Sequence, residues 1–351
     1  MSVDPDETLR HDLDAALERV ESALLELNGA SLLLTGGTGF FGGWLLALLS
    51  HARARLALKF KVTVLSRRPG DYLARAPMHV DLSLVDVVGG DVRDVELPGR
   101  RFSHVIHAAT DTRADAEREP MELIGAIIDG TRHVLDVARA CGAGRLLYLS
   151  SGAVYGAQPH DLAALSETYA GGCDPLDPRA AYGNAKRLAE HMCAIASIGP
   201  GPSCVVARCF AFVGPGMPLD GHFAIGNFIG DALAGRRIVV SGDGTPLRSY
   251  LYAGDLAAWL IALLVRGNAG EAYNVGSDQP VSIGELARRV GSLIPGAGAV
   301  LVKGEPAPGT PRNRYVPSIE KARALGLEVW TPLDAAILRT AESARAKRDI
   351  S

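Results

Sequence analysis

The stretch SLLLTGGTGFFGGWLLALLSHARA, residues 31–54, decides the fold. It begins as an apolar run that ends in glycines, and it continues from residue 40 with helical character. This order predicts a strand, a tight turn and a helix. The turn contains three regularly spaced glycines, Gly36, Gly39 and Gly42. Glycines let a pyrophosphate approach the N–H groups at the start of the helix, so the stretch predicts a dinucleotide-binding turn.

The glycine pattern alone fits a structural turn as well, and its place in the chain decides between the two interpretations. Further strands are predicted at residues 61–66, 82–91, 103–109, 145–151 and 203–210, and helices at 121–141 and 180–196. Strands that alternate with helices of this length form a parallel, doubly wound sheet. The predicted fold class is therefore α/β of the Rossmann type, in which the turn after the first strand binds dinucleotides.

Three regions follow from this pattern. Residues 31–210 are the predicted Rossmann domain, which binds the cofactor and carries the catalytic residues. From about residue 211 the chain is less regular, and residues 211–351 are predicted to form mainly a smaller α/β substrate-binding lobe, interleaved with the sheet. Residues 1–30 form an N-terminal helical extension. Its apolar residues recur at helical spacing, so we expect this helix to pack on the body of the protein or on a partner subunit.

Composition excludes several classes of protein. The chain has 351 residues, of which 48% are hydrophobic and 21% charged, so it is neither disordered nor a disulfide-stapled miniprotein. Its formal charge is −3 with mixed signs along the chain, which argues against nucleic-acid or membrane-surface binding. Five cysteines without a Cys-x-x-Cys pair or a histidine cluster predict reduced thiols and no metal site. Without a signal peptide or a long apolar span, we expect a soluble, cytoplasmic protein.

The end of the second predicted strand bears on the choice of cofactor. An acidic residue at this place holds the ribose 2′-hydroxyl of NAD, but this chain has Ser66, Arg67 and Arg68. A hydroxyl beside two guanidinium groups suits the 2′-phosphate of NADP, although the arginines also fit an ordinary solvated surface. The cofactor is therefore expected to be NAD or NADP, with NADP favoured.

A tyrosine and a lysine stand four residues apart in a predicted helix. Tyr182 and Lys186 therefore lie on one face, one turn apart. A phenol of pKa about 10 acts as an acid or base at neutral pH only when a nearby cation stabilises the phenolate. Ser150 and Ser151 end a strand at the carboxyl edge of the sheet, where a hydroxyl can hold a substrate oxygen. Such a pair alone also fits a solvated helix face.

Together these segments resemble the extended short-chain dehydrogenase/reductases, in particular the nucleotide-sugar epimerase/dehydratase family. The similar strings follow in family order from residue 35 to 277: TGGTGFFG, GDVRD, HAA, SSGAVYG, YGNAK, RCFAFVGP, GDGTPLRSY and YNVGS. The resemblance implies a homodimer formed through the helices at 121–141 and 180–196. It also implies a nucleotide-sugar substrate and hydride transfer to a nicotinamide.

The resemblance further implies roles for individual residues. Ser151, Tyr182 and Lys186 would form the catalytic triad, with Tyr182 as the base for a sugar hydroxyl. The implied cofactor-binding residues are Gly36, Gly39, Phe40, Phe41, Gly42, Ser66, Arg67, Arg68, Asp91, Val92, Ala108, Ala109, Tyr182 and Lys186. The implied substrate-binding residues are Thr110, Ser151, Asn227, Arg248 and Arg312, and Arg248 would pair with the diphosphate.

Departures from the family pattern reduce the number of activities that we expect for this chain. Dehydratases and decarboxylases of the family carry acidic residues just after the catalytic hydroxyl, whereas this chain has Gly152 and Ala153. Those activities become less expected unless the loop at 158–180 supplies a carboxylate. The candidates in it, for which solvation is the simpler role, are Glu167, Asp174 and Asp177.

The serine form of the motif resembles that of 4-epimerases and fits ketoreductases equally well. We therefore expect an NAD(P)-dependent nucleotide-sugar epimerase acting at C4 through a transient 4-keto sugar. The alternatives are an NADPH-dependent 4-ketoreductase of a 4-keto-6-deoxy sugar nucleotide and, in a different class, a non-catalytic NADP-binding protein. Two asparagines of the family are replaced by Ile127 and Ala211, for which His222 and Asn227 are candidate compensating residues.

Overall fold

The computed structural model describes residues 5–74, 79–110, 119–221, 223–307, 309 and 312–350. Its centre is a seven-stranded sheet in which every pair of neighbouring strands is parallel. The strand order is β11 (Ala272–Val275), β6 (Ser203–Cys209), β5 (Arg145–Ser151), β4 (His104–His107), β1 (Ser31–Thr35), β2 (Lys61–Ser66) and β3 (Val85–Gly89). The predicted Rossmann-type α/β fold is confirmed.

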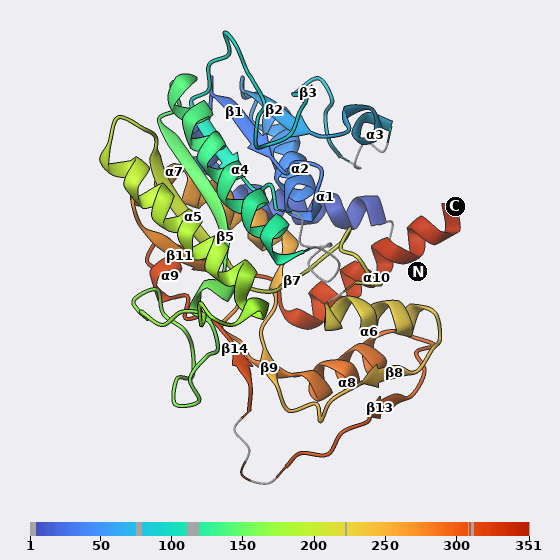
Figure 1. Ribbon diagram of the computed structural model, residues 1–351. Helices are drawn as coiled ribbons and strands as arrows, with labels where there is room; N and C mark the ends of the chain where they lie inside the picture. The colour runs from blue at the N-terminus through green and yellow to red at the C-terminus, as the bar shows by residue number, and fades with distance from the viewer. Residues whose placement is uncertain are drawn as a thin grey trace.

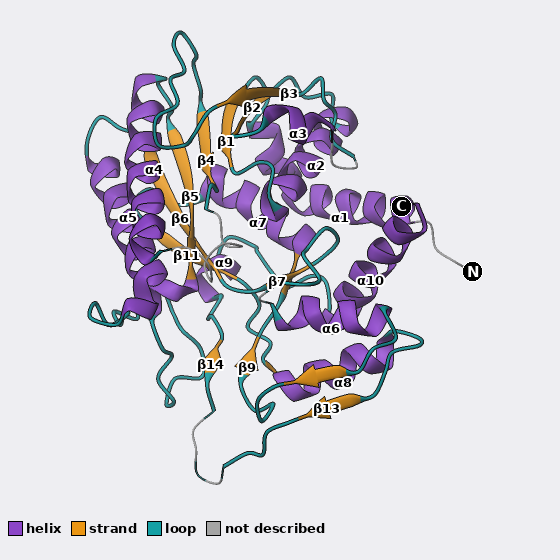
Figure 2. Cartoon of the chain, turned by 45° about the vertical axis from the view of Figure 1, so that its right-hand side comes forward, coloured by secondary structure: helices purple, strands orange, loops and turns teal. Residues whose placement is uncertain are grey.

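Helices cover both faces of the sheet (Figures 1 and 2). One face carries α4 (Pro120–Ala140) and α5 (Ala181–Ile198), and the other carries α2 (Phe40–Arg55) and α7 (Ala253–Arg266). The strands carry apolar side chains on both faces of the sheet, because helices cover both faces. Each face forms its own hydrophobic cluster with these helices. The register pairs Thr35 of β1 with His107 of β4, so the segments that follow these strands leave the sheet side by side.

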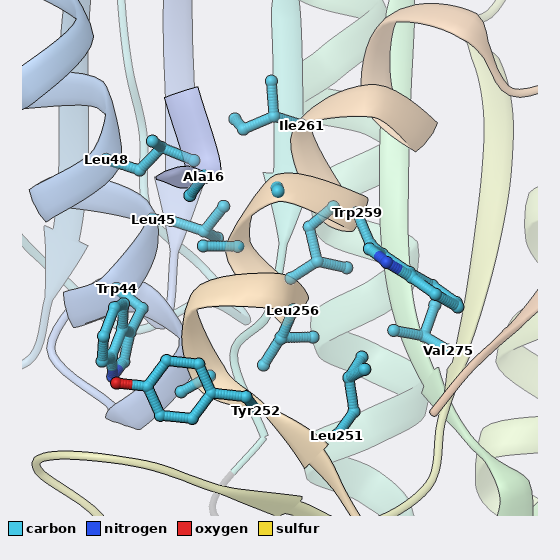
Figure 3. Close-up of a cluster of buried hydrophobic side chains, with 14 of the residues drawn as sticks. Ala16, Trp44, Leu45, Leu48, Leu251, Tyr252, Leu256, Trp259, Ile261 and Val275 are labelled. Carbon is cyan, nitrogen blue, oxygen red and sulfur yellow. The ribbon is translucent and has the colours of Figure 1, made fainter. Parts of the chain in front are cut away.

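The N-terminal extension is a third layer on the α2 and α7 side. Helix α1 (Pro5–Glu26) packs against both helices, and its predicted apolar face is buried at Leu13, Ala16, Leu17, Val20, Leu24 and Leu27. Figure 3 shows Ala16 facing the side chains of α2 and α7. Asp12 accepts a hydrogen bond from Tyr252 at 2.5 Å and pairs with Arg339. We expected this helix to pack either on the body of the protein or on a partner subunit. In the structure α1 packs on the body of its own chain.

The chain after residue 211 builds a lobe beneath the carboxyl edge of the sheet (Figure 2). Its helices are α6 (Ala224–Leu233), α8 (Ile283–Leu293), α9 (Glu320–Arg323) and α10 (Leu333–Ile350). Its short strands are β7 (Phe212–Val213), β8 (Ile238–Val240), β9 (Leu247–Arg248), β10 (Leu251–Tyr252), β12 (Val281–Ser282), β13 (Val300–Val302) and β14 (Arg314–Tyr315). Two elements from this part of the chain belong to the Rossmann domain: strand β11 is the last strand of the central sheet, and helix α7 packs on the face of the sheet. The two parts are therefore interleaved in the sequence.

Short elements fill the remaining connections. Helix α3 (Pro69–Ala74) follows β2, and two 3₁₀ turns, η1 (Gly152–Tyr155) and η2 (Pro178–Ala180), flank the loop before α5. The Gly- and Pro-rich sequence at 306–317 includes β14, whose two residues are too few to give a periodic pattern. Across the described ranges, no helix has both the length and the apolar character needed to cross a bilayer. The same ranges contain no group of three or more potential metal ligands.

Candidate active site

The turn after β1 closes only because its residues are glycines. Gly36 has a φ of 73°, in the left-handed region, and a Cβ atom there would lie 2.5 Å from the carbonyl oxygen of Ala108. At Gly42 a Cβ atom would lie 2.4 Å from the Cα atom of Gly37. Both distances are shorter than atoms tolerate, so a side chain at either position would open the turn. The first and third glycines of the motif therefore serve close backbone packing.

The helix that follows the turn is left uncapped. Helix α2 begins at Phe40, and its N-cap residue, Gly39, has no side chain to accept the N–H groups of the first turn. A Cβ atom on Gly39 would meet one atom, at 3.4 Å, so this side of the turn is open. Open backbone donors at the positive end of a helix dipole fit the pyrophosphate of a dinucleotide. Phe41 packs edge-on against Phe212 at 4.9 Å and fixes the helix start against the lobe.

The ends of β2 and β3 lie beside this turn and carry the residues predicted to face the adenosine half of the cofactor. Ser66 is buried, and its Oγ accepts the backbone N–H of Arg68 at 3.2 Å. The side chain of Arg68 is 81% exposed and lies 3.6 Å from Asp71. Asp91 accepts two hydrogen bonds from the Arg93 guanidinium, which is the largest cause of the lowered pKa of its carboxyl group.

Val92 and Arg67, two further residues predicted to bind the cofactor, lie near Asp91. Val92 lies against Gly130 of α4, at 3.0 Å from the position of a Cβ atom there. The positive charge of Arg67 contributes to the lowered pKa of Asp91, which places the guanidinium near that carboxylate. The residues at this edge therefore bring a hydroxyl, two guanidinium groups and one carboxylate to the end of the second and third strands.

The segment after β4 is held to β1 by a buried histidine. The Nδ1 of His107 lies 2.8 Å from the Oγ1 of Thr35, and its Nε2 lies 3.2 Å from the Oγ1 of Thr131. Thr35 also accepts the N–H of Ala109 at 3.2 Å. Burial, assisted by the charge of Lys186, lowers the pKa of His107 to about 3, so the ring stays neutral. Its role is to hold the Ala108–Ala109 segment against the glycine turn.

We expect His107 to make the protein less stable as the pH falls. The unfolded chain takes up a proton near pH 6.5, whereas the folded ring does so only near pH 3, so below pH 6.5 the unfolded state binds more protons. The free energy of unfolding should therefore fall by about 1 kcal/mol from this group between pH 6 and pH 5. Urea unfolding at several pH values measures it. His107→Gln should reduce the slope, and a variant with the slope of the wild type would contradict the assignment.

The predicted triad residues meet at the carboxyl end of β5. Lys186 is 2% exposed, and its Nζ donates to the Oγ1 of Thr110 and to the carbonyl of Leu149, both at 2.8 Å. The same Nζ lies 6.0 Å from the ring centre of Tyr182, one turn earlier in α5. Ser151 ends β5, and its Oγ accepts the N–H of Ala153 at 3.2 Å. The structure therefore brings the phenol, the ammonium and the serine hydroxyl to one place, with Thr110 beside them.

A buried polar network that the sequence motifs do not include supports this strand end. Ser150 donates to Glu190 at 2.6 Å, and Glu190 forms an ion pair with Arg208 of β6 at 2.7 Å. Arg208 also donates to the hydroxyl of Tyr155 at 2.9 Å, and that hydroxyl donates to Asn274 at 2.7 Å. A helical signal existed, since Glu190 stands four residues after Lys186 on the same face of α5.

The three carboxylates of the loop at 158–180 have structural partners. Glu167 accepts the backbone N–H of Asn274 at 2.7 Å, so it contributes to the attachment of this loop to β11. Asp177 caps η2 by accepting the N–H of Arg179, and Asp174 accepts the N–H of Leu176. Asp174 and Asp177 thus lie at the surface and bind groups of residues close by in the chain, whereas Glu167 has a structural role that the expected solvation did not include.

On the lobe side, Arg248 has the arrangement expected of an anion-binding residue. Its Nη1 donates to two neutral oxygens, the carbonyl of Leu247 at 2.8 Å and the Oδ1 of Asn313 at 3.0 Å. Burial lowers the pKa of its guanidinium. Its side chain is half-buried, and within the described residues it forms no ion pair with a carboxylate, so its positive charge is available to a ligand. Asn227 is half-buried in α6, Arg312 is exposed, and His222 lies outside the described residues.

Comparison with known proteins agrees with this arrangement. Residues 32–276 match the model of the NAD dependent epimerase/dehydratase family. The chain belongs to this family. It is 31% identical over 320 residues to UDP-glucuronic acid decarboxylase 1 of Xenopus tropicalis, covering 90% of this chain and 72% of that protein. The enzyme of the same name from Danio rerio is 29% identical over 320 residues, with coverage of 90% and 73%.

A solved structure extends the comparison to the fold. The UDP-glucose 4-epimerase of Thermus thermophilus in complex with NAD has a TM-score of 0.73 and 25% identity, covering 90% of this chain and 99% of that chain. The protein is therefore an enzyme of an NAD-dependent nucleotide-sugar family, as the resemblance implied, and the preference for NADP stays a prediction. Both of the curated relatives named above are decarboxylases, an activity that the motifs made less expected than epimerisation.

Proposed function

We propose that the protein is a nucleotide-sugar 4-epimerase that oxidises the C4 hydroxyl of a nucleotide-linked hexose and reduces the resulting ketone on its other face. The observation that carries the proposal is the group of Ser151, Tyr182 and Lys186 without a carboxylate at the two positions after the serine, while the nearby carboxylate of Glu190 is occupied by Ser150 and Arg208. Residues 152 and 153 are glycine and alanine, and Glu167 is held by the amide of Asn274. Elimination of water requires a further acid or base at the sugar, whereas epimerisation requires none.

Each residue of the centre has a defined task in this chemistry. Tyr182 as phenolate accepts the proton of the C4 hydroxyl, and Lys186 stabilises the phenolate through its charge. Ser151 donates a hydrogen bond to the C4 oxygen and holds it beside the phenol. The nicotinamide, when bound, supplies the hydride acceptor and donor. When the ketone is reduced, Tyr182 returns the proton to the same oxygen.

Two further sites complete the substrate and cofactor assignment. Arg248 is proposed to bind the diphosphate of the sugar nucleotide, because its half-buried charge has only neutral oxygens as hydrogen-bond partners among the described residues. Ser66, Arg67 and Arg68 favour NADP over NAD, since guanidinium groups suit a 2′-phosphate. A homodimer through α4 and α5 stays a prediction, consistent with the exposed Leu188 and Ile195 on α5.

Product analysis tests the proposal directly. Purified protein is incubated with UDP-glucose, UDP-galactose or UDP-glucuronic acid, and the sugar products are identified by proton NMR. We expect the C4 epimer of at least one substrate, with no release of carbon dioxide and no net change in cofactor. Mass spectrometry of the nucleotide released on denaturation should find nicotinamide dinucleotide at near one per chain.

The same assay detects the competing activities. Release of carbon dioxide from UDP-glucuronic acid with formation of a pentose would select a decarboxylase, the activity of the relatives at 29–31% identity. One-for-one consumption of NADPH with a 4-keto-6-deoxy sugar nucleotide would select a ketoreductase. Either result would contradict the epimerase proposal.

A further inference from the structure

We propose that Tyr148 is a positioning residue that holds the ammonium of Lys186 beside Tyr182 through the face of its aromatic ring. The Nζ of Lys186 lies over this ring, 4.8 Å from its centre. A cation within about 6 Å of a ring centre is attracted by the negative potential of the ring face. The proposal deepens the proposed function and rests on its assignment of Tyr182 and Lys186. It adds the residue that keeps the cation of this pair in place.

Strand β5 presents the ring to α5. Side chains alternate between the two faces of a strand. Tyr148 packs in the hydrophobic cluster under α4 and α5, whereas its neighbours Leu147 and Leu149 belong to the cluster on the other face. The carbonyl of Leu149 accepts a hydrogen bond from the same Nζ at 2.8 Å. Two consecutive residues of β5 thus bind the ammonium, and Ser151 ends this strand. One strand therefore carries both the serine hydroxyl and two of the groups that hold the cation.

The ring is fixed in turn by His107. The two residues are paired across β4 and β5, and their ring centres lie 5.5 Å apart. The imidazole is hydrogen bonded to Thr35 and Thr131, so its own orientation is set. Because this imidazole stays neutral, it neither repels the ammonium nor competes with it for the ring face. The aromatic ring therefore has a rigid neighbour in the adjacent strand.

Burial makes the contribution of the ring large. A buried ammonium loses the hydration that favours its charged form. The hydroxyl of Thr110 and the carbonyl of Leu149 replace part of this hydration by hydrogen bonds at 2.8 Å. The ring of Tyr148 adds an attraction that is strongest where water is excluded, and both side chains are buried here. A weaker ring would leave the ammonium less firmly held, and the phenolate of Tyr182 would lose part of its stabilisation.

Other titratable groups around the ammonium keep their charge state near neutral pH. Burial lowers the pKa of His107 to about 3 on β4 and raises the pKa of Cys209 to about 12 on β6. The pKa of the Cys193 thiol on α5 is also raised, by the neighbouring thiol of Cys204 and by burial. The carboxylate of Glu190 is held in an ion pair. The pH dependence of the rate in this range therefore reports the catalytic phenol.

Stepwise withdrawal of electron density from the ring tests the inference with little change in shape. Tyr148→Phe keeps the ring, and mono- and trifluorinated phenylalanine placed at the same position weaken its negative face in steps. Each protein is mixed with UDP-glucose, UDP-galactose or UDP-glucuronic acid, and reduction of the bound cofactor is followed by absorbance in single turnovers over a range of pH.

We expect Tyr148→Phe to keep the acid limb of this rate close to that of the wild type. Each fluorinated ring should move the limb to higher pH, by about half a unit to one unit for the trifluorinated ring. On the acid side this is a loss of about three- to tenfold in rate, because one pH unit corresponds to a factor of ten. A side chain with only a packing role would change the stability of the protein and leave the limb in place.

Two controls accompany the series. The same fluorinated residues at Phe102, which is buried in the same hydrophobic cluster and forms no cation–ring contact among the described residues, should leave the limb unchanged. In the Lys186→Met background the fluorinated rings at position 148 should have no effect on the rate, because the cation that faces them is gone.

The outcomes separate this inference from the proposed function. A limb that stays in place across the series, or an equal effect in the Lys186→Met background, would overturn the role of Tyr148 whatever the product. Cofactor reduction that yields no epimer would overturn the epimerase proposal. The series would then still decide the role of Tyr148, because the phenol acts in the first oxidation. A wild-type protein that reduces no cofactor with any of the three sugar nucleotides would overturn both.

Discussion

Tyr182→Phe is expected to lower kcat for sugar-nucleotide turnover by about 10²- to 10⁴-fold, the usual contribution of a positioned acid or base. The phenol stands one turn before the buried Lys186, whose ammonium lies 6.0 Å from its ring. Phenylalanine keeps the ring and removes the proton-transferring oxygen. Binding of substrate and cofactor should therefore change little, and the loss should appear in kcat.

The experiment compares steady-state rates of wild type and variant, with cofactor content and melting temperature measured in parallel. A variant that retains more than a few per cent of activity would contradict the assignment of Tyr182 as the base. A variant that has lost its cofactor would show instead that the phenol is needed for binding. Lys186→Met should also reduce kcat, but with an added loss of stability, because its ammonium holds Thr110 and the Leu149 carbonyl together.

The parts of the site that could be predicted from the sequence are those whose residues stand close together in the chain at a spacing that their function requires. The glycine turn could be predicted because Gly36 and Gly42 stand at fixed spacing between a strand and a helix, and the packing at both explains why glycine is required. Tyr182 and Lys186 could be predicted because helical spacing alone places them together. The parallel sheet followed from the alternation of strands with long helices.

The parts that could not be predicted depend on contacts between distant segments. Tyr315 stands in a Gly- and Pro-rich stretch without periodicity, and the pairing of β14 with β9 helps to bring its hydroxyl beside Gly152. Asp12 binds Tyr252 and Arg339, at separations of 240 and 327 positions, so the N-terminal helix joins the lobe to the Rossmann domain. No local rule relates such residues, because their proximity is a product of the whole fold.

The same dependence on distant segments explains why the structural role of Glu167 could not be predicted. Glu167 looked solvated because its neighbours in sequence are polar, yet it accepts the amide of Asn274 in the outermost strand of the sheet. Asn274 in turn donates to the carbonyls of Leu165 and Ser318. The loop before α5 is thereby tied to β11 and to the segment after β14. A carboxylate occupied in this way is poorly placed to serve as a catalytic acid.

Arg208→Leu is expected to lower the free energy of unfolding by about 3–5 kcal/mol, because it leaves the Glu190 carboxylate buried without its counter-ion. The pair is 2.7 Å apart, with side chains only 17% and 10% exposed. Removal of the guanidinium also takes a hydrogen bond from Tyr155. Chemical unfolding followed by circular dichroism measures the change.

Replacing Glu190 as well tests whether the loss of stability in Arg208→Leu comes from the unpaired carboxylate. In the double variant Arg208→Leu/Glu190→Leu no charge is left buried, so most of the lost stability should return, although Ser150 then lacks its acceptor. Arg139→Leu, which breaks an exposed pair with Asp136, should change stability by less than about 1 kcal/mol. A single Arg208→Leu variant as stable as wild type would mean that the pair is not buried as described. A double variant no more stable than the single one would place the energy in the hydrogen bonds to Ser150 and Tyr155, and hence in the support of β5 behind the catalytic serine.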